Sequence, residues 1–211
     1  MPLYKEWEYA NDTLAAIWHI TEPEAFFTEA TGIISDIKNE KRRMERLAGR
    51  YLLQLLEEEF PLHHIHPDEH DKPRVHNDEF LFSISHSWPY VAVAVSRTEE
   101  CGIDIQAWHK NIERIQHKFL SVEEQSIFGA DTNRITMAWT AKEAAYKWNG
   151  RRAVEFIENL PVTFLSKKQD KYNITIYLNL TVPPIMLSIE SFIEDDFACS
   201  YVVDSVNWAI Y

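Results

Sequence analysis

Glycine is scarce in this sequence of 211 residues, and its scarcity limits how the protein could bind a phosphate group. Only five glycines are present, and none forms a glycine-rich phosphate loop of the GxGxxG or GxxxxGK type. A phosphorylated ligand would therefore have to be held by side chains, by a metal ion or by the N-terminus of a helix.

Cysteine and long hydrophobic runs are also scarce. Cys101 and Cys199 are too few and too far apart for a disulfide framework or a zinc site, and a buried thiol is expected at each. The sequence has no run of about 18 apolar residues that could cross a membrane, and its N-terminus has no apolar signal core. These absences predict a cytoplasmic protein without a membrane partner.

Positive charge is in the minority. The sequence has 21 Lys and Arg against 33 Asp and Glu, and the net charge of −12 argues against a nucleic-acid partner. The hydrophobic content of 45% and the aromatic content of 13% indicate a globular protein with a sizeable core. Basic residues do gather between positions 41 and 50, on the exposed side of a predicted helix.

Hydrophobic periodicity predicts an α+β protein. Strands are expected at residues 13–20, 80–85, 90–96, 102–106, 162–165, 172–180, 186–192 and 197–203. Residues 91–95 are small and apolar on both faces, as in a strand covered on both sides. Helices are expected from residue 21 onward, over 38–60, over 112–130 with a break near 120–121, and over 133–148. At the break, Ser121 and Glu124 resemble a capping box, and the last helix is expected to end near residues 149–150. A long helix followed by strands occurs twice, which predicts two similar α/β halves, 1–100 and 101–211. Each half is expected to pack its helix on a small, mostly antiparallel sheet.

Residues 61–78 are rich in His, Asp and Pro and are expected to form a loop. Five of the nine histidines of the chain fall in this segment, at positions 63, 64, 66, 70 and 76. Their spacing matches no metal-ligand template, so a solvated loop is the better interpretation.

Three short segments carry residues suited to phosphate chemistry. Asp104 ends an apolar strand, although an acid has poor β propensity. Glu143 and Lys147 are four residues apart and share one face of a helix. His86 stands in a run of serines. Taken separately, these residues are explained as a turn aspartate, a surface ion pair and a structural histidine. Together they suggest a site for a divalent cation and a phosphate.

The order and spacing of these segments resemble one family, the 4′-phosphopantetheinyl transferases of the surfactin-synthetase-activating type. Residues 102–104 match its Gly-Ile-Asp motif, and residues 139–147 match its Trp-Thr-x-Lys-Glu-Ala-x-x-Lys motif, in the subgroup with Trp and Lys-Glu-Ala. The two acids lie 39 positions apart. Residues 43–50, 72–73 and 82–87 resemble further family segments, so the resemblance covers about residues 38–150.

The resemblance implies a reaction and its partners. Coenzyme A would bind in a cleft between two pseudo-symmetric halves of a monomeric chain, with Mg²⁺ bridging protein carboxylates and the pyrophosphate. A serine of an apo acyl or peptidyl carrier protein would attack the phosphate next to pantetheine and release 3′,5′-ADP. This is a holo-acyl-carrier-protein synthase activity, and fatty-acid, polyketide and nonribosomal-peptide carriers all stay open.

The resemblance also implies roles for residues of the second half. Asp104 and Glu143 would be metal ligands, and Glu143 could also accept the serine proton. Lys147 would contact the pyrophosphate and stabilise the departing phosphate. Many relatives have Glu where this chain has Gln106, so either its carbonyl oxygen or a water completes the metal site. We expect a two-carboxylate site that binds Mg²⁺ more weakly than theirs.

In the first half, the resemblance implies contacts to coenzyme A. Ser85 and His86 would hold the 3′-phosphate, with help from Arg50 and Lys38, and Lys72 would lie beside the adenine.

The carrier surface is a separate hypothesis, because acidic carriers need a basic or apolar patch to dock on. The candidates are Lys110, Arg114, Lys118, Phe119, Leu120 and Phe128. Two other functions stay open: a non-catalytic module that binds coenzyme A or a carrier, for which Gln106 is the only hint, and a different Mg²⁺-dependent phosphoryl enzyme.

Overall fold

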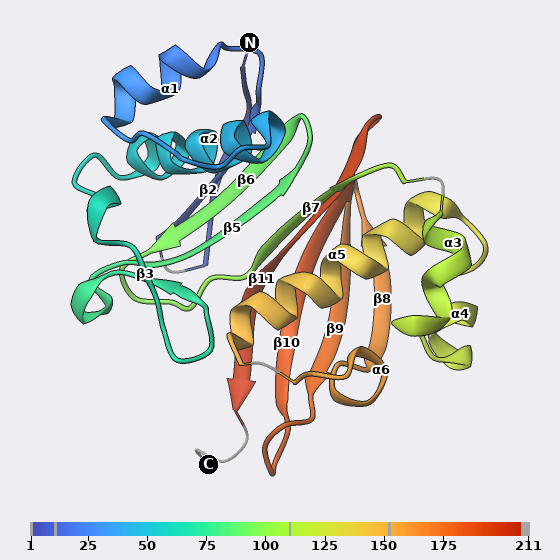
Figure 1. Cartoon of the computed structure of the whole chain (residues 1–211). Helices are drawn as coiled ribbons and strands as arrows, with labels where there is room; N and C mark the ends of the chain where they lie inside the picture. The colour runs from blue at the N-terminus through green and yellow to red at the C-terminus, as the bar shows by residue number, and fades with distance from the viewer. Residues whose placement is uncertain (1, 11, 110, 152, 208–211) are drawn as a thin grey trace. The chain divides into compact units, whose positions relative to one another are not determined.

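The computed structural model describes residues 2–10, 12–109, 111–151 and 153–207. The chain divides into two compact units, Met1–Cys101 and Gly102–Tyr211, and each unit combines helices with an antiparallel sheet (Figure 1). The predicted α+β class is therefore confirmed, whereas the pseudo-symmetry of the two halves stays a prediction.

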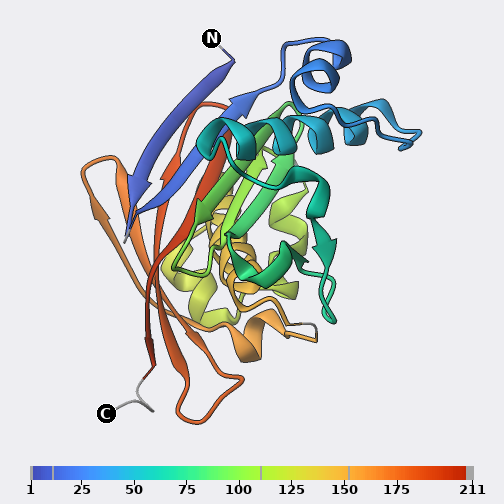
Figure 2. The ribbon, with the colours of Figure 1, turned by 90° about the vertical axis from the view of Figure 1, so that its left-hand side faces the viewer.

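The first unit is built on a four-stranded antiparallel sheet. Its order is β1 (Leu3–Tyr9), β2 (Thr13–His19), β6 (Tyr90–Ser96) and β5 (Leu81–Ser87). The helix α2 (Glu40–Leu56) packs on β2, β5 and β6, and α1 (Glu24–Thr31) packs on α2, as Figure 2 shows. Every residue of β6 is buried, as its run of small apolar residues predicted.

Two features of the first unit differ from the expectation. The strand β1 was not predicted, because its sequence LYKEWEY carries three charged residues that disfavour a strand. It pairs only with β2 at the edge of the sheet, where charged side chains reach solvent. The segment expected to be a loop also contains two short helices, η1 (Leu62–His64) and η2 (His76–Asp78), and the ribbon β3 (His66–Pro67) with β4 (Pro73–Arg74).

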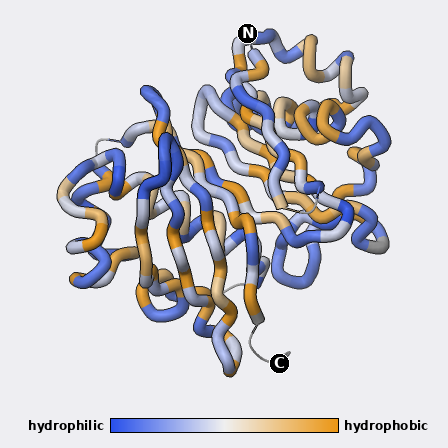
Figure 3. The backbone as a smooth tube through the Cα atoms, turned by 180° about the vertical axis from the view of Figure 1, so that it is seen from behind, coloured by the Kyte–Doolittle hydropathy of each residue, from blue (hydrophilic) through white to orange (hydrophobic). Residues whose placement is uncertain are grey.

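The second unit is built on a five-stranded antiparallel sheet. Its order is β7 (Ile103–Ala107), β11 (Phe197–Asn207), β10 (Ile185–Ile193), β9 (Lys171–Leu178) and β8 (Val162–Lys168). Hydrophobic and hydrophilic segments alternate along these strands (Figure 3). The helix α5 (Thr132–Asn149) packs against β7, β9, β10 and β11.

Short helices complete the second unit: α3 (Ile112–Ile115), η3 (Gln116–Lys118), α4 (Val122–Phe128) and α6 (Phe156–Asn159). The predicted capping box is confirmed, because the Ser121 hydroxyl accepts from the backbone of Glu124 while the Glu124 carboxylate accepts from the backbone of Ser121. The helix α5 ends, as predicted, at Gly150, whose φ of 68° is left-handed. None of the helices described is both long enough and apolar enough to cross a membrane.

Candidate functional site

Asp104 is the second of the five residues of β7 and is only 6% exposed, so it does not end the strand as expected. Its partner across the ladder is Ser200 of β11, so both side chains project from the same face of the sheet. The Ser200 hydroxyl lies 2.7 Å from the hydroxyl of Thr140 on α5. The strand therefore directs Asp104 toward the face that α5 covers.

Lys147 and Glu143 meet Asp104 from α5. The ammonium of Lys147 lies 2.6 Å from Oδ1 of Asp104. Burial and, to a smaller extent, the negative charge of Asp104 raise the pKa of the Glu143 carboxyl to about 7, and Lys147 opposes both effects. Two acids and one cation thus share one locus, which we call the α5–β7 site (Asp104, Glu143 and Lys147).

A chain of buried hydroxyls fixes α5 against the sheet beside this site. Ser200 contacts Thr140 on one side and Ser191 of β10 on the other, each at 2.7 Å between the hydroxyl oxygens. All three side chains are fully buried. Thr140 lies about one turn before Glu143 on α5, and Ser200 lies opposite Asp104 across the ladder. The contact between Thr140 and Ser200 therefore fixes the position of Glu143 relative to Asp104.

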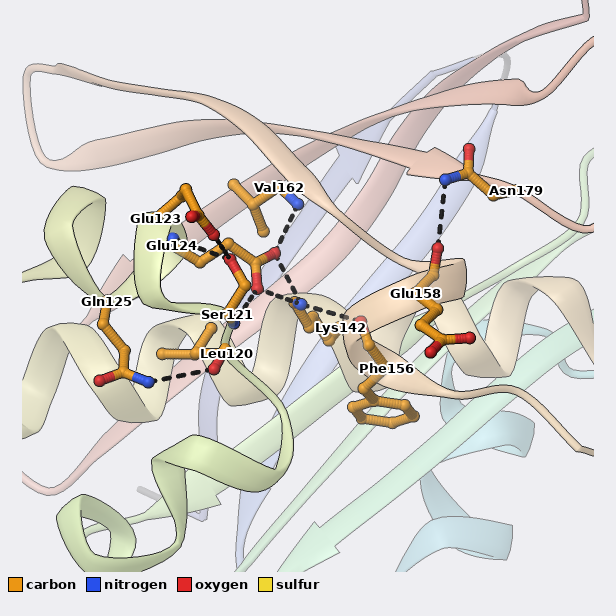
Figure 4. Close-up of polar contacts among 10 residues, drawn as sticks. All are labelled: Leu120, Ser121, Glu123, Glu124, Gln125, Lys142, Phe156, Glu158, Val162 and Asn179. Atoms are coloured by element: carbon orange, nitrogen blue, oxygen red, sulfur yellow. Dashed lines mark hydrogen bonds and ion pairs between the residues drawn. The ribbon is translucent and has the colours of Figure 1, made fainter.

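A buried ion pair holds the opposite side of α5. The ammonium of Lys142 lies 2.7 Å and 2.9 Å from the two carboxylate oxygens of Glu124 and donates to the carbonyl of Phe156 at 2.9 Å (Figure 4). Glu124 also accepts from the backbone N–H of Val162 at 2.7 Å. Burial lowers the pKa of Lys142, while Glu124 opposes that change. The sequence identified Glu124 only as a capping residue, and nothing local in it pointed to this second partner.

Gly102 is required by the close approach of β7 to α5. A Cβ atom at this position would lie 2.2 Å from the carbonyl oxygen of Ala144 and 2.7 Å from Cβ of Trp148. Ala144 directly follows Glu143 on α5, and Trp148 directly follows Lys147. Any larger residue must therefore push the helix away from Asp104.

Gly102→Ala tests this packing. We expect the variant to lose about 1–3 kcal/mol of unfolding free energy because the contact is with backbone, which cannot rotate away. The pKa of Glu143 should fall toward its ordinary value as α5 moves outward, which carboxyl NMR would measure. Gly129→Ala does not serve as a control, since Gly129 has a left-handed φ of 71°. Ala130→Gly, at an exposed position outside α5, is the better control. Full stability of Gly102→Ala would contradict the steric argument.

Gln106 projects from β7 two residues after Asp104 and is partly buried. Its Nε2 donates to the carbonyl of Ala107 at 3.0 Å. Among the residues described, no group of three or more His, Cys, Asp or Glu could hold a metal ion. The donor set nevertheless suits Mg²⁺, which takes one or two protein carboxylates and completes its shell with substrate oxygens and water.

The residues predicted in the first unit have varied surroundings. Ser85 is 4% exposed on β5, whereas the side chain of His86 is 54% exposed, with Nδ1 lying 3.2 Å from a carboxylate oxygen of Glu45 on α2. Glu45 was not identified from the sequence, because it stands in the middle of a predicted helix without any feature that marks it as a partner of His86. Its nearly buried carboxylate orients the imidazole.

Three predicted cations of the first unit differ in how they are paired. Arg50 on α2 has no ion-pair or hydrogen-bond partner among the described residues, and burial together with the charge of Arg46 lowers its pKa to about 10. Lys38 is exposed just before α2. The ammonium of Lys72 lies 2.7 Å from Glu100, so a ligand contact there would compete with an existing ion pair.

The predicted apolar anchors for a carrier protein are wrong. Phe119, Leu120 and Phe128 are at most 1% exposed and belong to the core of the second unit. Arg114 and Lys118 are exposed, on α3 and η3. The sixth candidate, Lys110, lies outside the described residues.

The comparisons with known proteins single out the second unit. Residues 100–202 match the family model of the 4′-phosphopantetheinyl transferase superfamily. No curated protein matches the chain. The matched segment contains Asp104, Glu143 and Lys147, and the superfamily transfers phosphopantetheine from coenzyme A to carrier proteins. The surfactin-synthetase-activating type and its subgroup stay predictions.

Proposed function

We propose that this chain is a Mg²⁺-dependent transferase that moves 4′-phosphopantetheine from coenzyme A to a serine of an apo carrier protein and releases 3′,5′-ADP. The observation that carries the proposal is the convergence of Asp104, Glu143 and Lys147 within the segment that matches the superfamily. A holo-acyl-carrier-protein synthase needs a proton acceptor and cations at the reacting phosphate, and these side chains supply both.

Each residue of the α5–β7 site has a role that its surroundings support. Glu143, with a pKa of about 7, can accept the proton of the attacking serine near neutral pH. Lys147 keeps 26% of its side chain exposed and can donate to a phosphate oxygen. Mg²⁺ would be held by Asp104 and Glu143, with the carbonyl of Gln106 or water, and would neutralise charge on the pyrophosphate.

The first unit offers residues for the remaining phosphate of coenzyme A. We propose that Ser85, His86, Arg50 and Lys38 hold the 3′-phosphate and that Lys72 lies beside the adenine. Arg50 supports this best: its guanidinium is desolvated, and within the described part of the chain no acid compensates it. An incoming phosphate would supply the missing counter-charge.

The carrier partner is proposed to dock on the exposed cations of α3 and η3. Arg114→Glu combined with Lys118→Glu should raise the KM for an acidic carrier about 10-fold without changing coenzyme A affinity, because like charges oppose the encounter. Steady-state kinetics with varied carrier, and calorimetry with coenzyme A, measure the two quantities. Lys168→Glu is the control for a charge reversal elsewhere on the second unit, since Lys168 is exposed on β8. An unchanged KM for the carrier would remove Arg114 and Lys118 from the interface.

Gln106 favours one alternative, a module that binds coenzyme A or a carrier without turnover. If Gln106 weakens the metal site, Gln106→Glu should tighten Mg²⁺ binding, because a carboxylate is a stronger ligand for Mg²⁺ than a neutral amide. Titration of Mg²⁺ by calorimetry measures the change, and Gln125→Glu on α4 is a control for added charge. Unchanged or weaker Mg²⁺ affinity would show that this side chain is not directed to the metal.

The function is tested by incubating the protein with coenzyme A, Mg²⁺ and an apo acyl carrier protein, followed by intact mass spectrometry. We expect the carrier to gain one phosphopantetheinyl group, with an equal amount of 3′,5′-ADP released. Binding of coenzyme A with no gain on fatty-acid, polyketide or peptidyl carriers would favour the non-catalytic alternative. Release of phosphate without any carrier would favour a different phosphoryl enzyme. Size-exclusion chromatography with light scattering tests the proposed monomer.

A further inference from the structure

The second unit also has a surface pocket, which the proposed transferase reaction does not use. Its volume is about 330 Å³, at the small end of the range for ligand pockets. Residues from two helices and a β-hairpin line it: Ile127 of α4, Arg134 of α5, Leu165, Ser166 and Lys167 of β8, and Tyr172 of β9. The lining includes two cations and no acid, although the chain as a whole carries a net charge of −12.

Arg134 is held in place but is short of acceptors. One terminal nitrogen of its guanidinium donates to the carbonyl of Ile127 at 2.8 Å, which fixes the side chain between α4 and α5. Its Nε–H is buried and has no hydrogen-bond partner within the described part of the chain. A guanidinium has five N–H donors in a planar fork that matches a carboxylate or a phosphate. An oxyanion in the pocket would supply acceptors that the protein does not.

Lys167 provides the second cation. Its ammonium lies 5.2 Å from the centre of the Tyr172 ring, and the two residues are direct partners across the β8–β9 ladder. No described carboxylate forms an ion pair with it. Ile127 and Leu165 add an apolar wall beside the two charges, where an uncharged part of a ligand could pack.

We propose that this pocket binds a small organic anion, in which a carboxylate or a phosphate is joined to an apolar group. The anionic end contacts Arg134 and Lys167, and the apolar end packs on Ile127, Leu165 and the Tyr172 ring. The pocket is separate from the α5–β7 site, because Arg134 precedes Glu143 by nine residues, roughly 14 Å along the helix. The inference stands whether or not the protein is a transferase.

The probes are phenyl phosphate and benzoate, which share an aromatic ring and differ in their charged group, with inorganic phosphate as the probe that lacks the ring. Each is titrated into the full chain while ¹H–¹⁵N NMR follows the backbone amides of β8 and β9 and the Nε–H of Arg134. We expect saturable shifts of these signals with at least one aromatic probe, and weaker binding of inorganic phosphate. The stronger aromatic probe identifies the preferred anionic group.

Matched lysine variants make the test specific. Lys167→Met should weaken binding of the aromatic anion about 10-fold, whereas Lys168→Met should leave it unchanged, because Lys168 is exposed next to it on β8 but does not line the pocket. Arg134→Gln should weaken binding further, and Lys167→Met alone suffices if that variant does not fold. The proposal is overturned if no probe shifts these signals, if both lysine variants bind equally, or if only Lys147→Met abolishes binding. The last result would place the anion at the α5–β7 site.

Discussion

Glu143→Gln should reduce phosphopantetheine transfer by about 10²–10⁴-fold while the protein stays folded, because the substitution removes the proton acceptor and one carboxylate of the proposed metal site. The amide preserves the shape of the side chain, so the loss reflects chemistry and not packing. The measurement is kcat/KM for an apo carrier at saturating coenzyme A. Glu69→Gln is the control, since that side chain is 87% exposed in the first unit.

The same variant should change stability in the opposite direction to activity. The Glu143 pKa of about 7 in the folded protein compares with an ordinary value of 4.5, so folding raises it. Above pH 7 the folded protein must hold an ionised, partly buried carboxylate, which costs up to about 3 kcal/mol, whereas below pH 4.5 the carboxyl is protonated in both states and costs nothing. Glu143→Gln should therefore stabilise the metal-free protein at pH 8 and lose that advantage between pH 7 and 4.5.

Urea denaturation of the wild-type protein and of Glu143→Gln at pH 8 and pH 5, with and without Mg²⁺, measures this difference in unfolding free energy and its pH dependence. Mg²⁺ should stabilise the wild-type protein by mass action and have little effect on Glu143→Gln. Equal stability of the two proteins at pH 8 would mean that Glu143 titrates normally and is not beside Asp104. A variant that retains transfer activity would exclude Glu143 as an essential group.

Lys142→Met should be the most destabilising single substitution on α5. It removes one partner of the buried ion pair and leaves Glu124 with an uncompensated charge, which costs about 3–5 kcal/mol. The Phe156 carbonyl also loses its donor. The measurement is the unfolding free energy from urea denaturation at pH 7.

A second substitution separates charge from packing. In Lys142→Met with Glu124→Gln, the amide at position 124 is neutral and can still accept from the backbone of Ser121 or Val162. We expect this double variant to recover about 1–3 kcal/mol of the loss, since the buried charge is gone. Lys168→Met, at an exposed position, should be neutral. If Lys142→Met alone lost less than 1 kcal/mol, Lys142 would have to reach solvent in solution, and the structure of this network would be incorrect.

The elements of the fold followed from periodicity wherever one side of an element faces a core. The helix α2 and the strands β5 and β9 were predicted for that reason. The strand β6 was predicted from its run of small apolar residues, and the break before Ser121 followed from its capping box. The strand β1 was missed because its charged residues outweigh its alternation. Phe119, Leu120 and Phe128 were wrongly predicted as docking anchors, because the position of a hydrophobic residue near basic ones in the sequence does not show whether its side chain is exposed or buried.

The candidate site was only partly predictable. Asp104, Glu143 and Lys147 stand out by residue type and spacing, and the structure brings them together. The contacts that hold them in place, from Thr140 to Ser200 and from Lys142 to Glu124, join residues 60 and 18 positions apart. Hydroxyls and a lysine in a helix have many ordinary roles, so no local pattern could identify these partners before the fold was known.

The mutual approach of Asp104 and Glu143 is tested most directly by the titration of the Glu143 carboxyl, followed by ¹³C NMR in the metal-free wild-type protein and in Asp104→Asn. We predict a pKa of about 7 in the wild type and a clear decrease in the variant, because the neighbouring negative charge is removed. An ordinary carboxyl pKa that is the same in both proteins would mean that the two acids do not share a site, and the proposed chemistry would have no basis.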